Sequence, residues 1–280
     1  MKDAAINGNQ LFLPEKESPV FVRVFYWYVL SLYRRRFRAV WLDDRQLLSS
    51  RRATLFIGNH NTWWDALTPL LLNERVIHKR ARAMMDEEQL LQFPFFRRLG
   101  VFSINRQHPR RALASLDYAV RLLNESGYPS TLDEPGNTSG AGPHRRNPNS
   151  GLPRAGRPVG LWFYPEGKLV RPETPITAEN GITWLAGKMD PDRTEIVPFT
   201  SHIHFMRGDK PELFVRMGTA LDRRMFEMKD DPVRDQSQTR RIAHIMEQLR
   251  ESTRRDSADF DRERNTVDGF RLLLGRPTST

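Results

Sequence analysis

The chain has 280 residues, of which 39% are hydrophobic and 28% are charged, so it can bury the core of an ordinary globular protein. It contains no cysteine, which excludes disulfide bonds, thiolate zinc sites and cysteine nucleophiles. Its 44 Lys and Arg residues outnumber its 34 Asp and Glu residues, and the formal charge of +10 favours phosphate, nucleic acid or anionic lipid as a partner.

The first predicted element is an aromatic, arginine-rich segment from Phe21 to Trp41. Its apolar part, Pro19 to Tyr33, is interrupted by Arg23 and followed by three arginines at 34–36, so it is too short to cross a bilayer as a helix. Aromatic rings and arginine side chains both suit the headgroup region of a membrane. We therefore predict that residues 1–45 are a helical segment that lies on a membrane surface. A helix that packs on the core and ends in a solvated basic turn is the alternative.

Short apolar runs then alternate with helical patterns along the chain. We predict strands at Ala53–Gly58, Arg82–Met85, Val101–Ile104, Val159–Tyr164, Glu195–Phe199 and Leu213–Met217. We predict helices at Ala66–Leu72, at Glu87–Arg98 with a break at Pro94, at Arg110–Asn124 with an end at Gly127, and at Thr239–Leu249. This alternation is typical of an α/β fold with a mainly parallel central sheet flanked by helices.

The composition changes abruptly from residue 129 to residue 158, where Pro, Gly, Ser, Asn and Arg predominate. So few apolar residues cannot form a core, and we predict a disordered insertion at 129–158. Patterned sequence resumes after it, so we assign residues 46–280 to one α/β domain that this insertion interrupts.

The clearest chemical signal is His60, which comes just after a predicted strand and five residues before Asp65. Histidine can accept and return a proton near neutral pH, and a carboxylate can orient it and stabilise the imidazolium. The sequence has no cysteine and no Gly-x-Ser-x-Gly motif to supply a nucleophile, which favours attack by a substrate hydroxyl that His60 activates. A structural histidine followed by an aspartate that caps a helix is the alternative.

A second signal, Glu166 and Gly167, stands in the run Phe-Tyr-Pro-Glu-Gly-Lys after another predicted strand. A carboxylate and a flexible glycine suit a binding loop in which Glu166 accepts hydrogen bonds from substrate hydroxyls. A plain Pro-Gly turn is the alternative. Between the two signals, Arg106 ends the run Gly-Val-Phe-Ser-Ile-Asn-Arg and offers a cation that can hold an anionic group bidentately.

These pieces occur in a recognisable order: His-x4-Asp, Gly-x-Phe-x-x-x-Arg, Phe-x-Pro-Glu-Gly and Ile-Val-Pro at 196–198. In this order the chain resembles the glycerolipid acyltransferase family, which includes the lysophosphatidic acid acyltransferases. The resemblance implies an α/β domain with an N-terminal membrane-binding element, and acyl transfer from acyl-CoA or acyl carrier protein as co-substrate without a cofactor. It further implies roles for individual residues: His60 as general base, Asp65 as its partner, Arg106 as a ligand of the acceptor phosphate, Glu166 and Gly167 as part of the acceptor site, and Val197 and Pro198 on the acyl side.

The chain departs from the family pattern at one block. The family commonly continues Glu-Gly-Thr-Arg-Ser, whereas this chain has Lys168, Leu169 and Val170 after Gly167. The block also opens Phe-Tyr-Pro instead of Phe-Pro. The usual arginine is missing, so Lys168 or Arg171 would have to substitute for its planar guanidinium group as a phosphate ligand. The acceptor is therefore a lysophospholipid such as 1-acylglycerol-3-phosphate or, alternatively, a glycolipid or other lipid alcohol.

Two functions of other classes compete with acyl transfer. His202 and His204 would point to one face of an extended strand and could join His60 and Asp65 around zinc, as in a metal-dependent hydrolase. The positive charge would suit a nucleic-acid binder, but the basic residues are scattered and no known binding module is present. We expect no bound metal and no nucleic-acid partner.

The polar residues 1–16 lack the basic start and apolar centre of a signal peptide. We therefore expect a peripheral membrane protein on the cytoplasmic face, with membrane lipids and acyl-CoA or acyl carrier protein as its partners.

Overall fold

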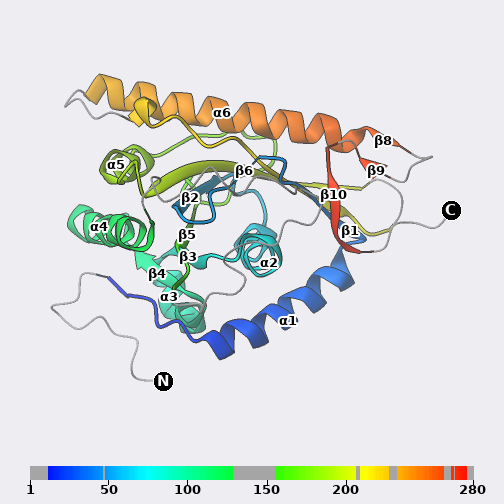
Figure 1. Ribbon diagram of the computed structural model, residues 1–280, viewed down its shortest axis with the longest axis horizontal. Coiled ribbons are helices and arrows are strands. Elements are labelled where there is room, and N and C mark those ends of the chain that lie inside the picture. The colour runs from blue at the N-terminus through cyan, green and yellow to red at the C-terminus, as the bar shows by residue number, and fades with distance from the viewer. Residues whose placement is uncertain are drawn as a thin grey trace, which may run out of the picture.

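The computed structural model describes residues 12–46, 48–128, 156–205, 209–226, 232–261, 266–267 and 269–275. Its main feature is an eight-stranded sheet with the order β10-β1-β7-β6-β2-β5-β3-β4 (Figure 1). The strands are β1 (Ala39–Asp43), β2 (Ala53–Gly58), β3 (Arg80–Asp86), β4 (Val101–Ile104), β5 (Val159–Phe163), β6 (Thr194–His204), β7 (Glu212–Met217) and β10 (Arg271–Gly275), with β8 (Phe260–Asp261) and β9 (Thr266–Val267) forming a separate pair.

Five neighbouring strands, β6, β2, β5, β3 and β4, run parallel to one another. β7 is antiparallel to β6, β1 is parallel to β7, and β10 is antiparallel to β1. The predicted α/β fold with a mainly parallel sheet is therefore confirmed. β2 lies in the middle of the parallel part, and all six of its residues are buried, which explains its continuous apolar run.

Helices cover both faces of the sheet. They are α1 (Pro19–Arg36), α2 (Thr68–Leu72), α3 (Glu87–Gln92), α4 (Pro109–Ser126), α5 (Gly181–Lys188) and α6 (Pro232–Ala258), together with the short turns η1 (Trp63–Ala66), η2 (Asn73–Ile77), η3 (Pro94–Leu99) and η7 (Arg223–Phe226). Apolar side chains of α4, α5 and α6 pack with Leu55 and Ile57 on one face of β2. Those of α1 and α2 pack with Phe56 on the other face (Figure 1). The result is a three-layer arrangement.

Most predicted elements are present, and two of them, β2 and β4, have the predicted bounds. The predicted break at Pro94 is confirmed, because α3 ends at Gln92 and a 3-10 turn begins at Pro94. α4 ends at Ser126, and Gly127 follows as its C-cap with φ −79° rather than in the left-handed conformation. Glycine is needed there because a Cβ would collide with the main-chain oxygen of Arg193.

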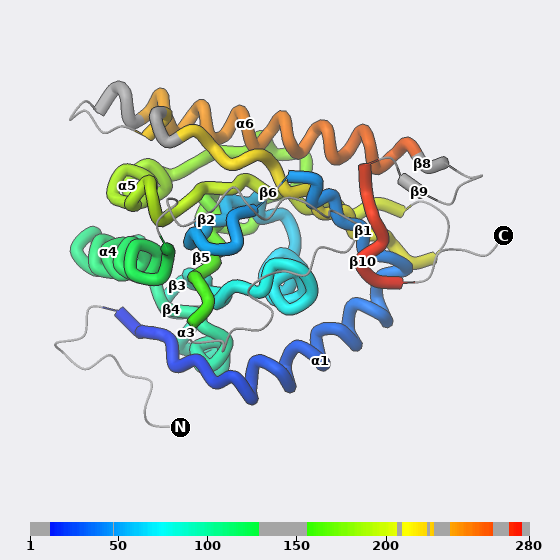
Figure 2. The backbone as a smooth tube through the Cα atoms, in the orientation of Figure 1, coloured from blue at the N-terminus to red at the C-terminus, as the bar shows by residue number. Residues whose placement is uncertain are grey.

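The N-terminal segment differs from its prediction in extent. α1 ends at Arg36, and Trp41 lies in β1, whose five residues are all buried between β7 and β10. Figure 2 traces the chain from α1 into this strand, which lies beside β10 near the other end of the chain. The predicted helical segment 1–45 therefore includes a strand of the main sheet. Among the described residues, no helix combines the length and apolarity needed to span a bilayer. Residues 129–155 of the predicted insertion lie outside the described part of the chain.

Candidate active site

His60 lies at the carboxyl edge of the parallel strands, two residues beyond the end of β2. The ends of β5, β4 and β6 meet at the same edge because these strands are parallel to β2. The sheet thus brings together four segments that are far apart in the sequence: the two residues Asn59 and His60, the turn after β4, the Tyr-Pro-Glu-Gly segment after β5, and the end of β6.

His60 and Asp65 face each other across the short loop between β2 and η1. Nδ1 of His60 lies 3.6 Å from Oδ2 of Asp65, and the two side chains are 20% and 1% exposed. This Nδ1 atom is buried and has no hydrogen-bond partner among the described residues. At 3.6 Å the pair is slightly beyond hydrogen-bond length, so a small approach of the imidazole would complete the contact.

Backbone and side-chain donors hold the carboxylate of Asp65. Oδ2 accepts hydrogen bonds of 2.7 Å from the main-chain N–H groups of Asn61 and Thr62, and Oδ1 accepts one of 2.5 Å from the hydroxyl of Ser201. The bonds to Oδ2 make Asp65 a cap for the 3-10 turn that begins at Trp63. The capping role and the pairing with His60, which the sequence presented as alternatives, therefore coexist.

Tyr164 is a site residue that the sequence did not single out. Its ring stacks on the imidazole of His60 at a centroid distance of 4.4 Å and an interplanar angle of 20°. Its hydroxyl donates to the main-chain oxygen of Asp65, and burial raises its pKa well above the usual value, so the hydroxyl stays protonated. Tyr164 thus contacts both members of the pair. Its position directly before Pro165, at the end of a strand parallel to β2, is the sequence feature that could have identified Tyr164 as a site residue.

Glu166 fixes the main chain of His60. One carboxylate oxygen, Oε2, accepts from the N–H of His60 at 2.8 Å, and the N–H of Val170 donates to the carbonyl of His60 at 2.9 Å. Glu166 is buried, and this burial raises its pKa above the ordinary value. Its other oxygen, Oε1, has no hydrogen-bond partner among the described residues. The loop after β5 therefore holds the main chain of His60 at both its N–H and its carbonyl group.

Arg106 joins this group from the turn after β4. Gly167 has φ +65°, and a Cβ on it would lie 2.5 Å from the guanidinium Nη1 of Arg106, so the arginine packs directly against this glycine. Lys168 and Arg171 follow as exposed side chains. The structure thus places three cations near the Glu-Gly turn, one of them in contact with it.

Pro198 lies within β6. It sits opposite Ile57 in the β2–β6 ladder, and a Cβ on Gly218 would touch both Pro198 and Leu249 of α6. Its neighbours Val197 and Phe199 belong to the core cluster on the α1 and α2 face. Pro198 therefore faces α6, whereas Asp65 contacts the opposite face of β6 through Ser201.

His202 and His204 share one face of β6, with ring centroids 5.8 Å apart. Strand alternation turns them away from Ser201 and therefore from Asp65, toward α6, whose Arg250 and Arg254 help to lower the pKa of His202 after the larger effect of burial. The described residues contain no group of three or more His, Cys, Asp or Glu side chains that could hold a metal ion. The metal-dependent hydrolase alternative therefore lacks a convergent set of metal ligands among the described residues.

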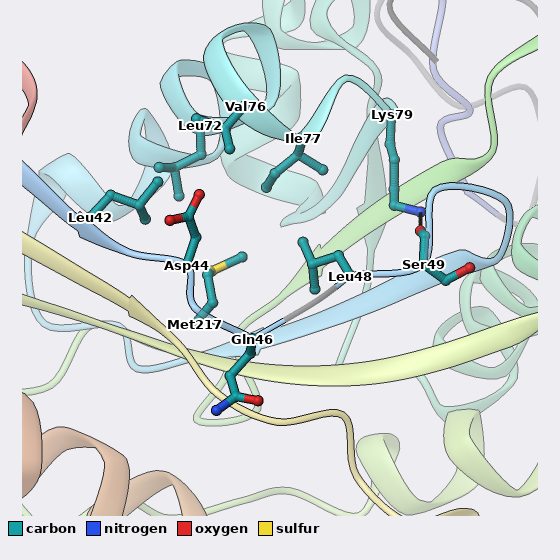
Figure 3. A pocket seen from close by; sticks show the side chains of 10 residues that line it. All are labelled: Leu42, Asp44, Gln46, Leu48, Ser49, Leu72, Val76, Ile77, Lys79 and Met217. Carbon is teal, nitrogen blue, oxygen red and sulfur yellow. Dashed lines mark hydrogen bonds between the residues drawn. The ribbon is translucent and has the colours of Figure 1, made fainter. Parts of the chain in front are cut away.

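A cavity of about 150 Å³ lies near the amino ends of the parallel strands (Figure 3). Its wall is mostly apolar, with Leu42, Leu48 and Leu72 among its members. The ammonium group of Lys79 donates a hydrogen bond of 2.7 Å to the main-chain oxygen of Ser49. Ser49 and Lys79 precede β2 and β3, so this cavity and the His60 site lie at opposite ends of the parallel strands.

The chain is similar to a known protein family. A family model described as Acyltransferase covers residues 40–202, more than half of the chain. The matched range includes His60, Asp65, Arg106 and Glu166 and leaves out α1 and α6. No curated protein matches the chain.

Proposed function

The chain belongs to the glycerolipid acyltransferase family and is an acyltransferase, and from this premise we propose that His60 is the general base of the transfer reaction. The observation that carries the proposal is the pairing of His60 with the buried Asp65 at the carboxyl edge of β2. In this pairing Nδ1 faces the carboxylate and Nε2 remains for the substrate. The stacked ring of Tyr164 sets the plane of the imidazole.

The proposed reaction needs no enzyme nucleophile. Nε2 of His60 takes the proton from the acceptor hydroxyl as its oxygen attacks the thioester carbonyl of the donor. The tetrahedral intermediate then collapses, the carbon–sulfur bond breaks, and the thiolate leaves and takes up the proton from the imidazolium. Asp65 stabilises the imidazolium while it exists and holds the ring in the required tautomer. Acyl-CoA or acyl carrier protein is the donor in this scheme.

We favour a lysophospholipid such as 1-acylglycerol-3-phosphate as the acceptor. Arg106 supports this choice, because it packs on Gly167 beside the loop that holds His60. Lys168 and Arg171 add exposed positive charge close by. A glycolipid or other lipid alcohol is the second candidate. Glu166 favours it, because its Oε1, which has no partner among the described residues, can accept a hydrogen bond from an uncharged hydroxyl.

The deciding experiment compares acyl transfer to lysophosphatidic acid and to its dephosphorylated analogue in identical mixed micelles. His60→Ala and Asp65→Asn should each lower kcat by about 100-fold or more toward both acceptors, which is the usual scale for loss of a positioned base. Arg106→Ala should raise the KM for lysophosphatidic acid by about 10- to 100-fold, because a charge-assisted contact is lost. Arg241→Ala, on the exposed side of α6, is the control for a general loss of positive charge.

Full activity of purified His60→Ala would contradict the mechanism. Equal rates with the two acceptors, and no specific effect of Arg106→Ala, would instead remove only the phosphate acceptor and favour the lipid alcohol.

A further inference from the structure

β6 extends beyond the end of the strand beside it. The parallel ladder between β2 and β6 ends at Gly58 and Phe199, and β6 continues to His204 paired with β7. The main-chain groups of β6 just beyond Phe199 therefore need another partner on the β2 side. Because buried main-chain groups are almost always hydrogen-bonded, the residue that supplies this partner is structurally constrained.

The side chain of Asn59 supplies it. Its Oδ1 accepts from the N–H of Ser201 at 3.0 Å, and its Nδ2 donates to the carbonyl of Ser201 at 3.2 Å. Both residues are buried. This reciprocal pair continues the sheet ladder by one step with a side chain in place of a main chain. It ties the residue directly before His60 to a defined position on β6.

The same residue of β6 also reaches Asp65. The hydroxyl of Ser201 donates to Oδ1 of Asp65 at 2.5 Å in a buried contact. In this bond the Ser201 hydroxyl is the donor and Oδ1 of Asp65 is the acceptor. With Oδ1 held by Ser201, Oδ2 is the oxygen that faces Nδ1 of His60. A rotation of the carboxylate would break the Ser201 bond and both N–H bonds at Oδ2 together.

We propose that Ser201 is a positioning residue for the Asp65–His60 pair. It is hydrogen-bonded to both ends of the segment that carries His60, to Asn59 at one end and to Asp65 at the other. The role rests on the proposed function of His60 as general base. Ser201 itself contacts neither the imidazole nor, in the proposed scheme, the substrate. It acts by fixing the carboxylate that orients the imidazole.

The kinetic test uses three variants. Ser201→Ala removes the hydroxyl and should lower kcat by about 10- to 100-fold with little change in the KM of either substrate, because a misplaced catalytic group slows chemistry without weakening binding. Ser201→Thr keeps a hydroxyl in a residue that suits a strand and should restore kcat to within about threefold of wild type. Thr200→Val is the matched control, because the hydroxyl of Thr200 is buried on the other face of β6 without a partner among the described residues.

A second measurement does not depend on activity. The N–H groups of Asn61 and Thr62 both donate to Asp65, so their hydrogen exchange reports whether the carboxylate stays in place. In Ser201→Ala these two amides should exchange about tenfold faster, the scale of one weakened hydrogen bond, while the amides of β2 exchange as in wild type. Thr200→Val should leave Asn61 and Thr62 unchanged.

The outcomes separate the two proposals. If wild type transfers no acyl group to any tested acceptor, the proposed function fails, and the exchange rates still decide the role of Ser201. Wild-type kcat and wild-type exchange in Ser201→Ala would overturn the positioning role. Faster exchange throughout the protein, or a Ser201→Thr variant as slow as Ser201→Ala, would also overturn it, because either result would mean that the residue only stabilises the fold.

Discussion

Asp65 uses the two oxygens of one carboxylate for different tasks. Oδ1 is tied to β6 through Ser201, whereas Oδ2 closes the turn at Trp63 and faces His60. A residue that caps a turn is fixed in space before any substrate binds, which is what a catalytic orienter requires. Turn formation and catalysis therefore favour the same residue at the same position.

His202 shows a different consequence of burial. Burial is the first cause and the positive charge of neighbouring groups the second, and together they lower the pKa of His202 to about 4. An unfolded chain would have the ordinary value of about 6.5. The unfolded state therefore binds a proton between these two values while the folded state does not. It follows that the free energy of unfolding rises with pH from about 4 to about 6.5 and falls on acidification through the same range.

We predict that His202→Gln removes part of this acid sensitivity. Between pH 7.5 and pH 4.5 the wild type should lose about 1 to 2 kcal/mol more stability than the variant, a range reduced for the partial exposure of the ring. Urea denaturation at the two pH values measures this difference. His244→Gln, on the exposed side of α6, is the control. Identical pH dependence in His202→Gln and wild type would show that His202 is not the sensitive group.

At the scale of elements, α1 has two unlike faces. Val22, Val29, Leu30 and Tyr33 are buried, and the Tyr33 hydroxyl contacts the carbonyl of Trp64 at 3.2 Å, so the helix is attached to the segment that carries Asp65. Its other face exposes Val20, Val24, Trp27 and Tyr28. Phe95 of η3, itself partly exposed, extends this apolar surface through contacts with Phe21 and Phe25. Three exposed arginines at 34–36 follow at the end of the helix.

Such a combination of apolar and basic groups suits the surface of an anionic membrane, and we predict that this face of α1 binds it. The double variant Val24→Ser and Trp27→Ser should weaken binding to vesicles that contain anionic lipid by at least about tenfold, because two apolar side chains no longer leave water. Vesicle sedimentation measures the binding. Wild-type binding should also fall at high salt, since the arginine contribution is screened.

The control for this prediction is Leu113→Ser, which likewise replaces an exposed apolar side chain by serine, but on α4. Undiminished vesicle binding of the double variant, with or without salt, would rule out α1 as the membrane-binding face.

At the scale of the whole molecule, the residues that flank the predicted insertion are held by the fold itself. The N–H of Val159, the first residue of β5, donates to the hydroxyl of Ser126, the last residue of α4, at 3.0 Å. The N–H of Tyr128 donates to the carbonyl of Arg51 at 3.1 Å. The end of α4 and the start of β5 are therefore adjacent, and a short connection can join them.

We predict that replacing residues 131–155 by a short Gly-Ser linker preserves the fold. The entropy of closing a chain connection changes only slowly with its length, so the Tm should stay within about 5 °C of wild type. Calorimetry tests this, and acyl-transfer assays on the same protein test whether the segment has a catalytic role. A large fall in Tm would show that these residues pack on the domain.

Local sequence was sufficient for several features because their causes are local. The apolar run of β2 and the break at Pro94 follow from burial and from the missing proline N–H, and the order of the motif blocks identified the family. The pattern also put His202 and His204 on one face of a strand, as observed. Whether the two histidines face α6 or the Asp65 side of β6 depends on what packs against the strand, and no local sequence pattern encodes this.

Only the tertiary structure decided the remaining features, because they depend on pairings between distant segments. β1 and β10 have the apolar residues of strands, but their places in the sheet, β10 at its edge and β1 beside it, come from pairing across more than 200 residues. Tyr164 and Ser201 carry no motif of their own, and each matters through what the parallel sheet brings beside it, 104 and 136 residues away respectively from His60 and Asp65. The sequence alone determined the fold class and the family, whereas the arrangement that holds His60 and Asp65 arises from strand order and register, which only long-range packing sets.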